Sequence, residues 1–297
     1  MRNQPTAAWT PLPLSRLQRD QIPSEIFLRF KKELGEVNSH LCIVDAAMQR
    51  LAHDYARSPN KIEFLRLCTR CHGHRHLASD KLDFVFSIRL AYISQIALLL
   101  SRLEQLCRSI GKHPFINKNL KERMVGDFLR RAIWLVAASR EGEKLPTPIE
   151  DSVTSRYLDP LDIGIFDFYR TMRNLELHPA TPSSPKNDVN LDQHGNLAAA
   201  YSKIDQDRCK AEFNYTPTLS DLLSFRDVLL VSMSCQRIAR SLCRSIVDPE
   251  RDLLPELKRK FANQANKRRN NAARALLSQS FLLDSDEVEA LVCDLAW

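Results

Sequence analysis

Apolar residues recur at steps of three and four along most of this chain, which is the spacing of one face of an α-helix. The clearest case runs from Ile26 to Leu51 and predicts an amphipathic helix over 24–56, with Ser24 as N-cap, either continuous or broken at Gly35. The same spacing predicts helices over 61–68, 80–110, 119–139, 164–177 and 218–247, followed by two or three short helices.

Prolines and polar clusters mark the segments between these helices. Residues 1–22 are expected to be extended, 140–162 to form a loop, and 180–217 to be irregular with a hairpin around Gly195. The pattern predicts an all-α helical bundle with long antiparallel helices. Its expected divisions are an extended segment over 1–23, a helical domain over 24–247 and a C-terminal helical extension over 248–297.

The composition excludes some classes of function and favours others. The 297 residues include only 7 Gly, all isolated, so no glycine-rich loop exists to hold a dinucleotide or a nucleoside triphosphate. The scarcity of Gly also favours helices over a strand-rich fold. Lys and Arg total 43 against 36 Asp and Glu, and 29 of the 43 are Arg, whose planar fork suits phosphate. An anionic partner such as RNA is therefore favoured.

The candidate chemistry lies at the end of the helix predicted over 164–177. Arg173 is followed directly by Asn174, and His178 comes five residues after Arg173, before Pro179. Arg108 and His113 show the same Arg-to-His spacing, but Arg108 is not followed by Asn. Five residues of a regular helix rotate by about 140°, so the two side chains would diverge if the helix continued. Pro179 disfavours helical geometry at His178, which lets the imidazole turn back toward the helix.

These side chains suit cleavage of RNA by its own ribose. A neutral His178 can take a proton from a 2′-hydroxyl or give one to the leaving 5′-oxygen at physiological pH. Arg173 can neutralise the phosphate and the developing charge, with Arg170 nearby, and Asn174 can orient His178 or bind a phosphate oxygen. The products would be a 2′,3′-cyclic phosphate and a 5′-hydroxyl, with no metal or cofactor. The structural alternative is that Arg173 pairs with Glu176 or Asp167 and that His178 caps the helix end.

The stretch Arg173-Asn174 to His178 resembles the R-N-x-x-x-H form of the motif that characterises the HEPN superfamily. The resemblance implies a helical bundle over most of 24–247 and a metal-independent endoribonuclease of toxin or antiviral defence type. It further implies a homodimer whose cleft joins two Arg-His sets, and a regulatory protein or antitoxin as a further partner. One branch of the superfamily carries a Tyr two positions after the His, where this chain has Ala180. Regulation through that Tyr is not expected.

A second cluster contains Cys68, Cys71, His72, His74 and His76. It matches the CxxCH pattern of haem attachment, which requires an exported environment, and it offers thiolate and imidazole ligands for zinc. Structural zinc usually takes a second ligand pair at a distance, and the other cysteines show no paired spacing. We therefore expect no metal and favour a basic surface loop that touches RNA, with zinc as the alternative.

A basic segment over 251–274 precedes an acidic C-terminus. It provides candidate RNA contacts at Lys258, Arg259, Lys260, Lys267, Arg268 and Arg269. The alternative is a solvated helical face. Residues 284–297 contain acids but no Lys or Arg, so they are expected either to fold back on the basic helices or to bind a partner through residues such as Leu291 and Leu295. A non-catalytic RNA- or protein-binding module based on 251–274 is the competing function.

The expected location is the cytoplasm. The N-terminus has no continuous apolar stretch of the kind found in a secretion signal, so the 8 cysteines are expected to be reduced thiols. Apolar runs such as 96–100 are too short to span a bilayer, and no membrane association is expected.

Overall fold

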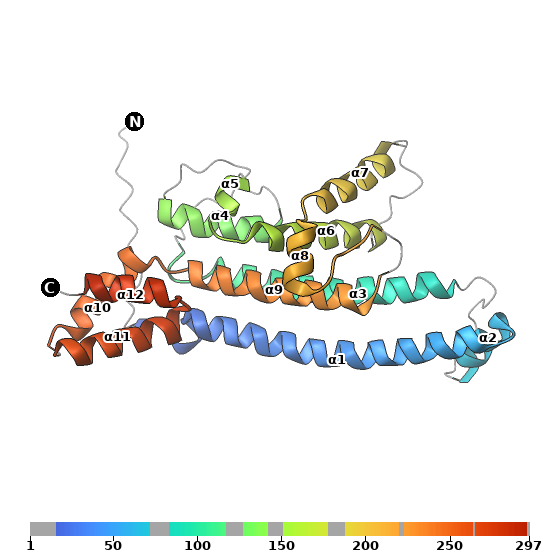
Figure 1. Ribbon diagram of the computed structural model, residues 1–297, viewed down its shortest axis with the longest axis horizontal. Helices are drawn as coiled ribbons and strands as arrows, with labels where there is room; N and C mark the ends of the chain where they lie inside the picture. Colours follow the sequence, from blue (N-terminus) through green and yellow to red (C-terminus); the bar gives the residue numbers. More distant parts are fainter. Residues whose placement is uncertain are drawn as a thin grey trace, which may run out of the picture. The chain divides into compact units, whose positions relative to one another are not determined.

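The computed structural model describes residues 16–71, 83–116, 127–141, 151–177, 188–219, 223–263 and 265–295, without the side chains at 70, 71, 141, 151, 188–194 and 266. Over these ranges the chain is helical and contains no strand (Figure 1). The predicted all-α class is confirmed.

The helices differ in length from a single turn to 35 residues. In chain order they are α1 (Pro23–Arg57), α2 (Lys61–Cys71), α3 (Phe84–Ile110), α4 (Phe128–Glu141), α5 (Asp151–Thr154), α6 (Pro160–Leu177), α7 (Asp188–Ser202), α8 (Gln206–Phe213), α9 (Phe225–Ser245), α10 (Leu254–Phe261), α11 (Asn266–Phe281) and α12 (Ser285–Asp294). A 3-10 turn, η2 (Arg19–Gln21), precedes α1, and a π-helical turn, η4 (Pro249–Leu253), precedes α10.

α1 is continuous through Gly35, where an added Cβ would meet nothing within 4 Å. The N-cap prediction at Ser24 is wrong, because the helix begins at Pro23 and the carbonyl of Ile22 accepts the first helical hydrogen bond from Ile26. Proline suits this first position because its missing N–H would have no helical partner there. The turn η2 lies in the segment that was expected to be extended.

The segments predicted as a loop and as a hairpin contain helices. α5 forms within 140–162, and α6 begins at Pro160, where Asp159 accepts a hydrogen bond from the backbone N–H of Leu161 at 2.9 Å. The predicted hairpin is wrong because α7 runs through Gly195. One Gly inside a helix costs only about 1 kcal/mol, and the alanines at 198–200 favour the helix. α9 begins at Phe225 rather than near Thr218.

The chain forms two compact units, and each takes segments that are distant in sequence. Unit 1 comprises Met1–Lys32, Ser101–Ile163 and Cys235–Trp297, and unit 2 comprises Glu33–Leu100 and Gly164–Ser234. Parts of α1, α3, α6 and α9 belong to each unit. The segment 248–297, predicted as an extension, belongs to unit 1.

In unit 2 four helices surround an apolar core. Residues less than 3% exposed come from every one of them: Leu34 and Leu41 of α1, Tyr92, Ile93, Ile96, Leu99 and Leu100 of α3, Ile165, Phe166, Phe168, Tyr169 and Met172 of α6, and Val228, Leu230 and Val231 of α9. The stripe predicted on α6 is confirmed at Ile165, Phe168, Tyr169 and Met172, whereas Leu175 is half-buried.

Polar pairs connect these four helices in a closed order. Asn38 of α1 bonds Ser232 of α9 at 2.8 Å, and Tyr92 of α3 donates to Asp45 of α1 at 2.8 Å. The other two pairs are Arg89 with Glu176, between α3 and α6, and Tyr169 with Asp227, between α6 and α9. Each helix of the bundle is therefore hydrogen-bonded to two others, which fixes its rotation about its own axis.

Unit 1 packs its C-terminal helices against one another. Arg274 of α11 pairs with Glu289 of α12 at 2.7 Å, and Arg244 of α9 lies 3.3 Å from Asp284. Leu291 and Leu295 are 3% and 0% exposed. The acidic C-terminus therefore folds back on the basic helices, and these two leucines are buried within the unit.

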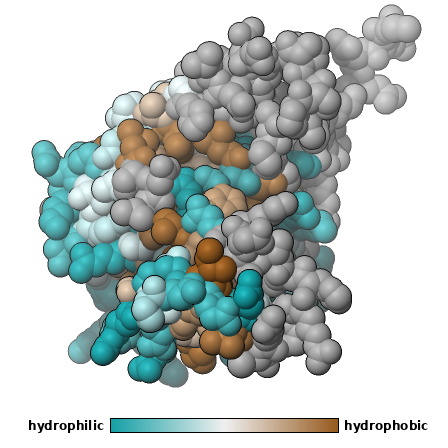
Figure 2. Space-filling model, turned by 90° about the vertical axis from the view of Figure 1, so that its right-hand side faces the viewer, coloured by the Kyte–Doolittle hydropathy of each residue, from teal (hydrophilic) through white to brown (hydrophobic). Residues whose placement is uncertain are grey.

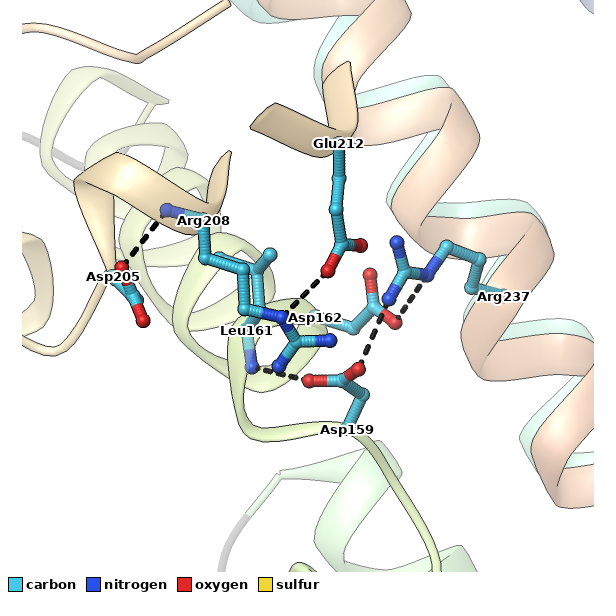
Figure 3. A network of polar contacts seen from close by, with 7 residues as sticks. All are labelled: Asp159, Leu161, Asp162, Asp205, Arg208, Glu212 and Arg237. Atoms are coloured by element: carbon cyan, nitrogen blue, oxygen red, sulfur yellow. Dashed lines mark hydrogen bonds and ion pairs between the residues drawn. The ribbon is translucent and has the colours of Figure 1, made fainter. Parts of the chain in front are cut away.

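An arginine also ties the start of α6 to α9 within unit 1 (Figure 3). Arg237 donates from Nε to Asp162 at 2.9 Å and from Nη2 to Asp159 at 3.0 Å. Asp162 is only 2% exposed, so its charge requires such a partner.

Apolar side chains also reach the surface. Figure 2 views the molecule from the side on which Figure 1 draws α2, and hydrophobic surface is visible there among hydrophilic residues. Ile62 and Leu67 of α2 and Val85 and Phe86 of α3 are each more than half exposed. α3 is long and apolar enough to cross a membrane by length and composition alone, a test that core helices of soluble proteins also pass.

We predict that Tyr169→Phe lowers the free energy of unfolding by about 1–3 kcal/mol, because the buried Asp227 carboxylate loses the hydroxyl that donates to it at 2.5 Å. Tyr55→Phe is the control: its ring stacks on Phe84 at 4.2 Å, and its hydroxyl makes no hydrogen bond to the described residues. Urea unfolding monitored by circular dichroism measures both. Equal effects of the two substitutions would contradict the role of the Tyr169 hydroxyl.

Alkaline pH is expected to destabilise unit 1. Burial, with a smaller contribution from Asp162, raises the pKa of the Cys235 thiol from about 9 to about 12. Between these values the unfolded chain releases the proton while the folded chain keeps it, so the stability present below pH 9 is lost as pH rises. We predict that Cys235→Ala reduces the slope of unfolding free energy against pH by about 1 kcal/mol per pH unit between pH 9 and 11. Cys42→Ala, at an exposed cysteine, should keep the wild-type slope.

Candidate functional site

Arg173 and Asn174 lie in the last turns of α6, next to the buried Met172 in the sequence. Met172 is 2% exposed, whereas Arg173 and Asn174 are half-buried. Arg170 is half-buried one turn before Asn174. Because the apolar stripe fixes which face of α6 points inward, it also fixes the directions in which these polar residues point.

Asn174 holds the guanidinium group of Arg173. Its Oδ1 accepts hydrogen bonds from Arg173 Nη2 at 2.7 Å and from Nε at 3.1 Å. Two donors on one acceptor restrict the rotation of the guanidinium plane. The Arg and Asn that are adjacent in the motif are therefore hydrogen-bonded through their side chains, and Asn174 orients the Arg173 guanidinium.

Glu176 was one predicted partner of Arg173, but it binds Arg89 instead. Its Oε1 accepts from Arg89 Nη2 at 2.6 Å and from Arg89 Nε at 3.0 Å. The two side chains are 15% and 23% exposed, so the pair is shielded from solvent. This contact attaches the C-terminal end of α6 to α3 directly before His178.

A pocket opens next to Asn174. It has a volume of about 660 Å³, and α6 contributes Asp167, Thr171, Asn174 and Leu175, which are spaced along one helical face. The facing side consists of Asn196, Ala199 and Ala200 of α7 and Lys203 after it. Sequence reasoning missed Asn196 and Lys203 because they lie in the segment expected to be irregular and no motif contains them.

Several predicted residues lie outside the described part of the chain. These are His178 at the candidate site and His72, His74 and His76 of the Cys-His cluster. Cys68 is described and half-buried, but the side chain of Cys71 is not described. Among the described residues, no group of three or more His, Cys, Asp or Glu side chains is arranged to hold a metal ion.

The competing Arg-His pair has a structural role. His113 is 4% exposed, its Nδ1 accepts from the N–H of Phe115 at 3.2 Å, and its Nε2 lies 2.7 Å from the carbonyl of Gln21. Burial lowers the pKa of His113, which favours the neutral ring with its proton on Nε2. Arg108, 71% exposed, pairs with Glu104. His113 therefore connects the loop after α3 to the segment before α1, and Arg108 and His113 do not form a shared polar site.

The basic segment presents part of its charge to solvent. Arg259 and Lys260 of α10 and Lys267 and Arg268 of α11 are exposed, and Lys258 is half-buried. Arg259 also pairs with Glu256 at 2.8 Å. Arg269 is only 6% exposed, so its side chain faces the protein interior and is not accessible to a phosphate backbone.

No protein-family model, no curated protein and no solved structure matches this chain. The resemblance to HEPN proteins therefore rests on the residues of the R-N-x-x-x-H motif.

We predict that Glu176→Gln lowers the free energy of unfolding by about 1–2 kcal/mol, because the guanidinium of Arg89 loses its charged acceptor in a shielded setting. Glu63→Gln is the matched control, since its pair with Arg66 is more than 40% exposed on both sides and should contribute less than about 0.5 kcal/mol. Urea denaturation of both variants tests this. If Glu176→Gln lowers the free energy of unfolding no more than Glu63→Gln does, the contact between Arg89 and Glu176 does not anchor α6.

Proposed function

We propose that this protein is a metal-independent endoribonuclease in which Arg173 and His178 are catalytic and Asn174 positions Arg173. The observation that supports the proposal most is the double hydrogen bond from Arg173 to Asn174 beside the pocket that Asn174 lines. An oriented guanidinium next to a pocket with both polar and apolar lining suits a phosphodiester whose neighbouring nucleotide needs space.

The proposed reaction is transfer of the phosphodiester within the RNA. A neutral His178 removes the proton of the 2′-hydroxyl, and the 2′-oxygen attacks phosphorus while the bond to the 5′-oxygen breaks. The leaving 5′-oxygen takes a proton, and the products are a 2′,3′-cyclic phosphate and a 5′-hydroxyl. Arg173 stabilises the negative charge that accumulates on the non-bridging oxygens.

One His cannot act as base and acid in the same step. We therefore propose a homodimer in which His178 of a second copy donates the proton to the leaving oxygen. The proposed setting is a toxin or defence system in the cytoplasm, with a regulatory protein or antitoxin as partner. These expectations follow from the resemblance to HEPN proteins.

A second candidate function is RNA binding without chemistry. The exposed cations on α10 and α11, at Arg259, Lys260, Lys267 and Arg268, favour it. In that case the residues at the end of α6 would make no contribution to the activity.

We predict that purified wild-type protein cleaves mixed RNA in EDTA and leaves 2′,3′-cyclic phosphate ends. Arg173→Ala and His178→Ala should each lower the rate by about 100-fold or more. Asn174→Ala should lower it by about tenfold, since Arg173 remains but loses its orientation. Arg108→Ala, at the matched Arg-His spacing, should stay within about twofold of wild type, because Arg108 is an exposed residue that pairs with Glu104 and is not part of the candidate site.

Equal cleavage by all of these proteins would contradict the site assignment, and activity that EDTA abolishes would contradict a metal-independent reaction. Gel-shift assays with the triple variant Lys260→Glu, Lys267→Glu and Arg268→Glu separate the two candidates. If the wild-type protein shows no cleavage and the triple variant loses RNA binding, the result would favour the binding module.

A further inference from the structure

The pocket that Asn174 lines is closed at one end by a close approach of α6 to the end of α7. A Cβ added at Gly164 would lie 3.2 Å from the carbonyl oxygen of Lys203, so glycine lets the two backbones come this close without a shift. One turn further along α6, the rings of Phe168 and Tyr201 have their centres 5.5 Å apart. These two contacts hold the end of α7 against α6.

Small side chains leave room beyond that contact. α7 contributes Ala199 and Ala200 to the lining, and α6 contributes Leu175 as a larger apolar side chain. The volume of about 660 Å³ lies within the range of about 300–1,000 Å³ that is usual for pockets that bind small molecules. The lining therefore suits a flat ring system with apolar faces and a polar edge.

Three polar side chains of the lining have hydrogen-bonding groups that are unused within the described residues. Asn174 accepts two hydrogen bonds at Oδ1, but its Nδ2 donates none. The hydroxyl of Thr171 and the carboxamide of Asn196 make no hydrogen bond to the described part of the chain. Asp167 and Lys203 also line the pocket, and each of them already interacts with another group. The unused groups are uncharged, and they come from both helices.

We propose that this pocket holds an adenine base of the RNA and that the carboxamide of Asn196 selects it, an inference that rests on the proposed nuclease function. A carboxamide carries an acceptor beside a donor, which matches the amino group and the N7 nitrogen of adenine. Guanine presents two acceptors, O6 and N7, at the same edge, so the carboxamide would satisfy only one of them. Asn196 is exposed, so a base entering from solvent can reach it.

Asn174 connects this pocket with the proposed chemistry. It lines the pocket, and its Oδ1 holds the guanidinium of Arg173 at 2.7 Å from Nη2. We therefore place the adenine in a nucleotide next to the phosphate that Arg173 contacts. Cleavage is expected beside adenines, with Asn196 determining specificity and taking no part in the chemical step.

Fluorescence anisotropy with oligonucleotides that cannot be cleaved tests base selection separately from catalysis. The probes are labelled 2′-deoxyuridine hexamers in which one central base is adenine, guanine, cytosine or uracil. We expect the full wild-type chain to bind the adenine probe at least about fivefold more tightly than the other three. Asn196→Ala should abolish this preference. Because Asn196 is exposed, the variant is expected to fold, and circular dichroism checks this.

Three further variants make the test specific to the pocket. Asn196→Asp replaces the donor by a second acceptor, so it should lose the preference for adenine and favour cytosine, whose amino group donates. Ala199→Leu, at an exposed position of the lining, should weaken binding of the adenine probe at least about fivefold, because the larger side chain occupies the pocket. Ser202→Ala is the matched control on α7: its hydroxyl donates to the carbonyl of Ala199 and does not line the pocket, so the preference should persist.

Equal binding of the four probes by wild type, or a preference for adenine that survives in Asn196→Ala, would overturn the proposal. Mapping of cleavage sites on mixed RNA separates it from the nuclease assignment. Wild type should cut beside adenines, and Asn196→Ala should cut without base preference. A protein that prefers the adenine probe but cleaves no RNA would support base selection and contradict catalysis. Cleavage without any preference for adenine would support catalysis and overturn base selection.

Discussion

Burial of one face of α6 is the constraint on which the candidate site depends. Ile165, Phe168, Tyr169 and Met172 are at most 2% exposed, so this helix has a single orientation in which its apolar stripe is covered. Each residue of a helix advances by about 100°, so the burial of Met172 places Arg173 at the border of the core and directs Asn174 away from the buried stripe. The polar groups proposed to act on RNA are positioned by hydrophobic packing one residue away.

Polar contacts then make that orientation more specific than hydrophobic burial alone. Asp227 is 2% exposed and accepts hydrogen bonds from the hydroxyl of Tyr169 and from the N–H and hydroxyl of Ser224. Burial, followed by the Asp227 charge, raises the pKa of Tyr169 well above its ordinary value, so the phenol remains a donor. Together with the pair of Arg89 and Glu176, this contact opposes rotation of α6, because any rotation would leave a buried charge without a partner.

Local sequence signals predicted the helices whose apolar stripes are long, such as α1, and the stripe of α6. They failed where the signal was weak. One glycine at 195 suggested a turn, but the cost of a single Gly is small beside that of breaking a helix, and α7 continues through it. The motif identified Arg173 and Asn174 because they are adjacent. It did not identify Asn196 or Lys203, which reach the same pocket from another helix.

The sequence by itself determined the helical class and the side of α6 that is buried, because both depend on residues within a few turns of one another. It also placed Asn174 beside Arg173. Only the tertiary structure decided that Glu176 binds Arg89 of α3, that α12 pairs with α11, and that Asn196 and Lys203 line one pocket with Asn174. These contacts join residues far apart in the chain, and their pairing is set by packing and charge satisfaction across the fold, which helical periodicity does not encode.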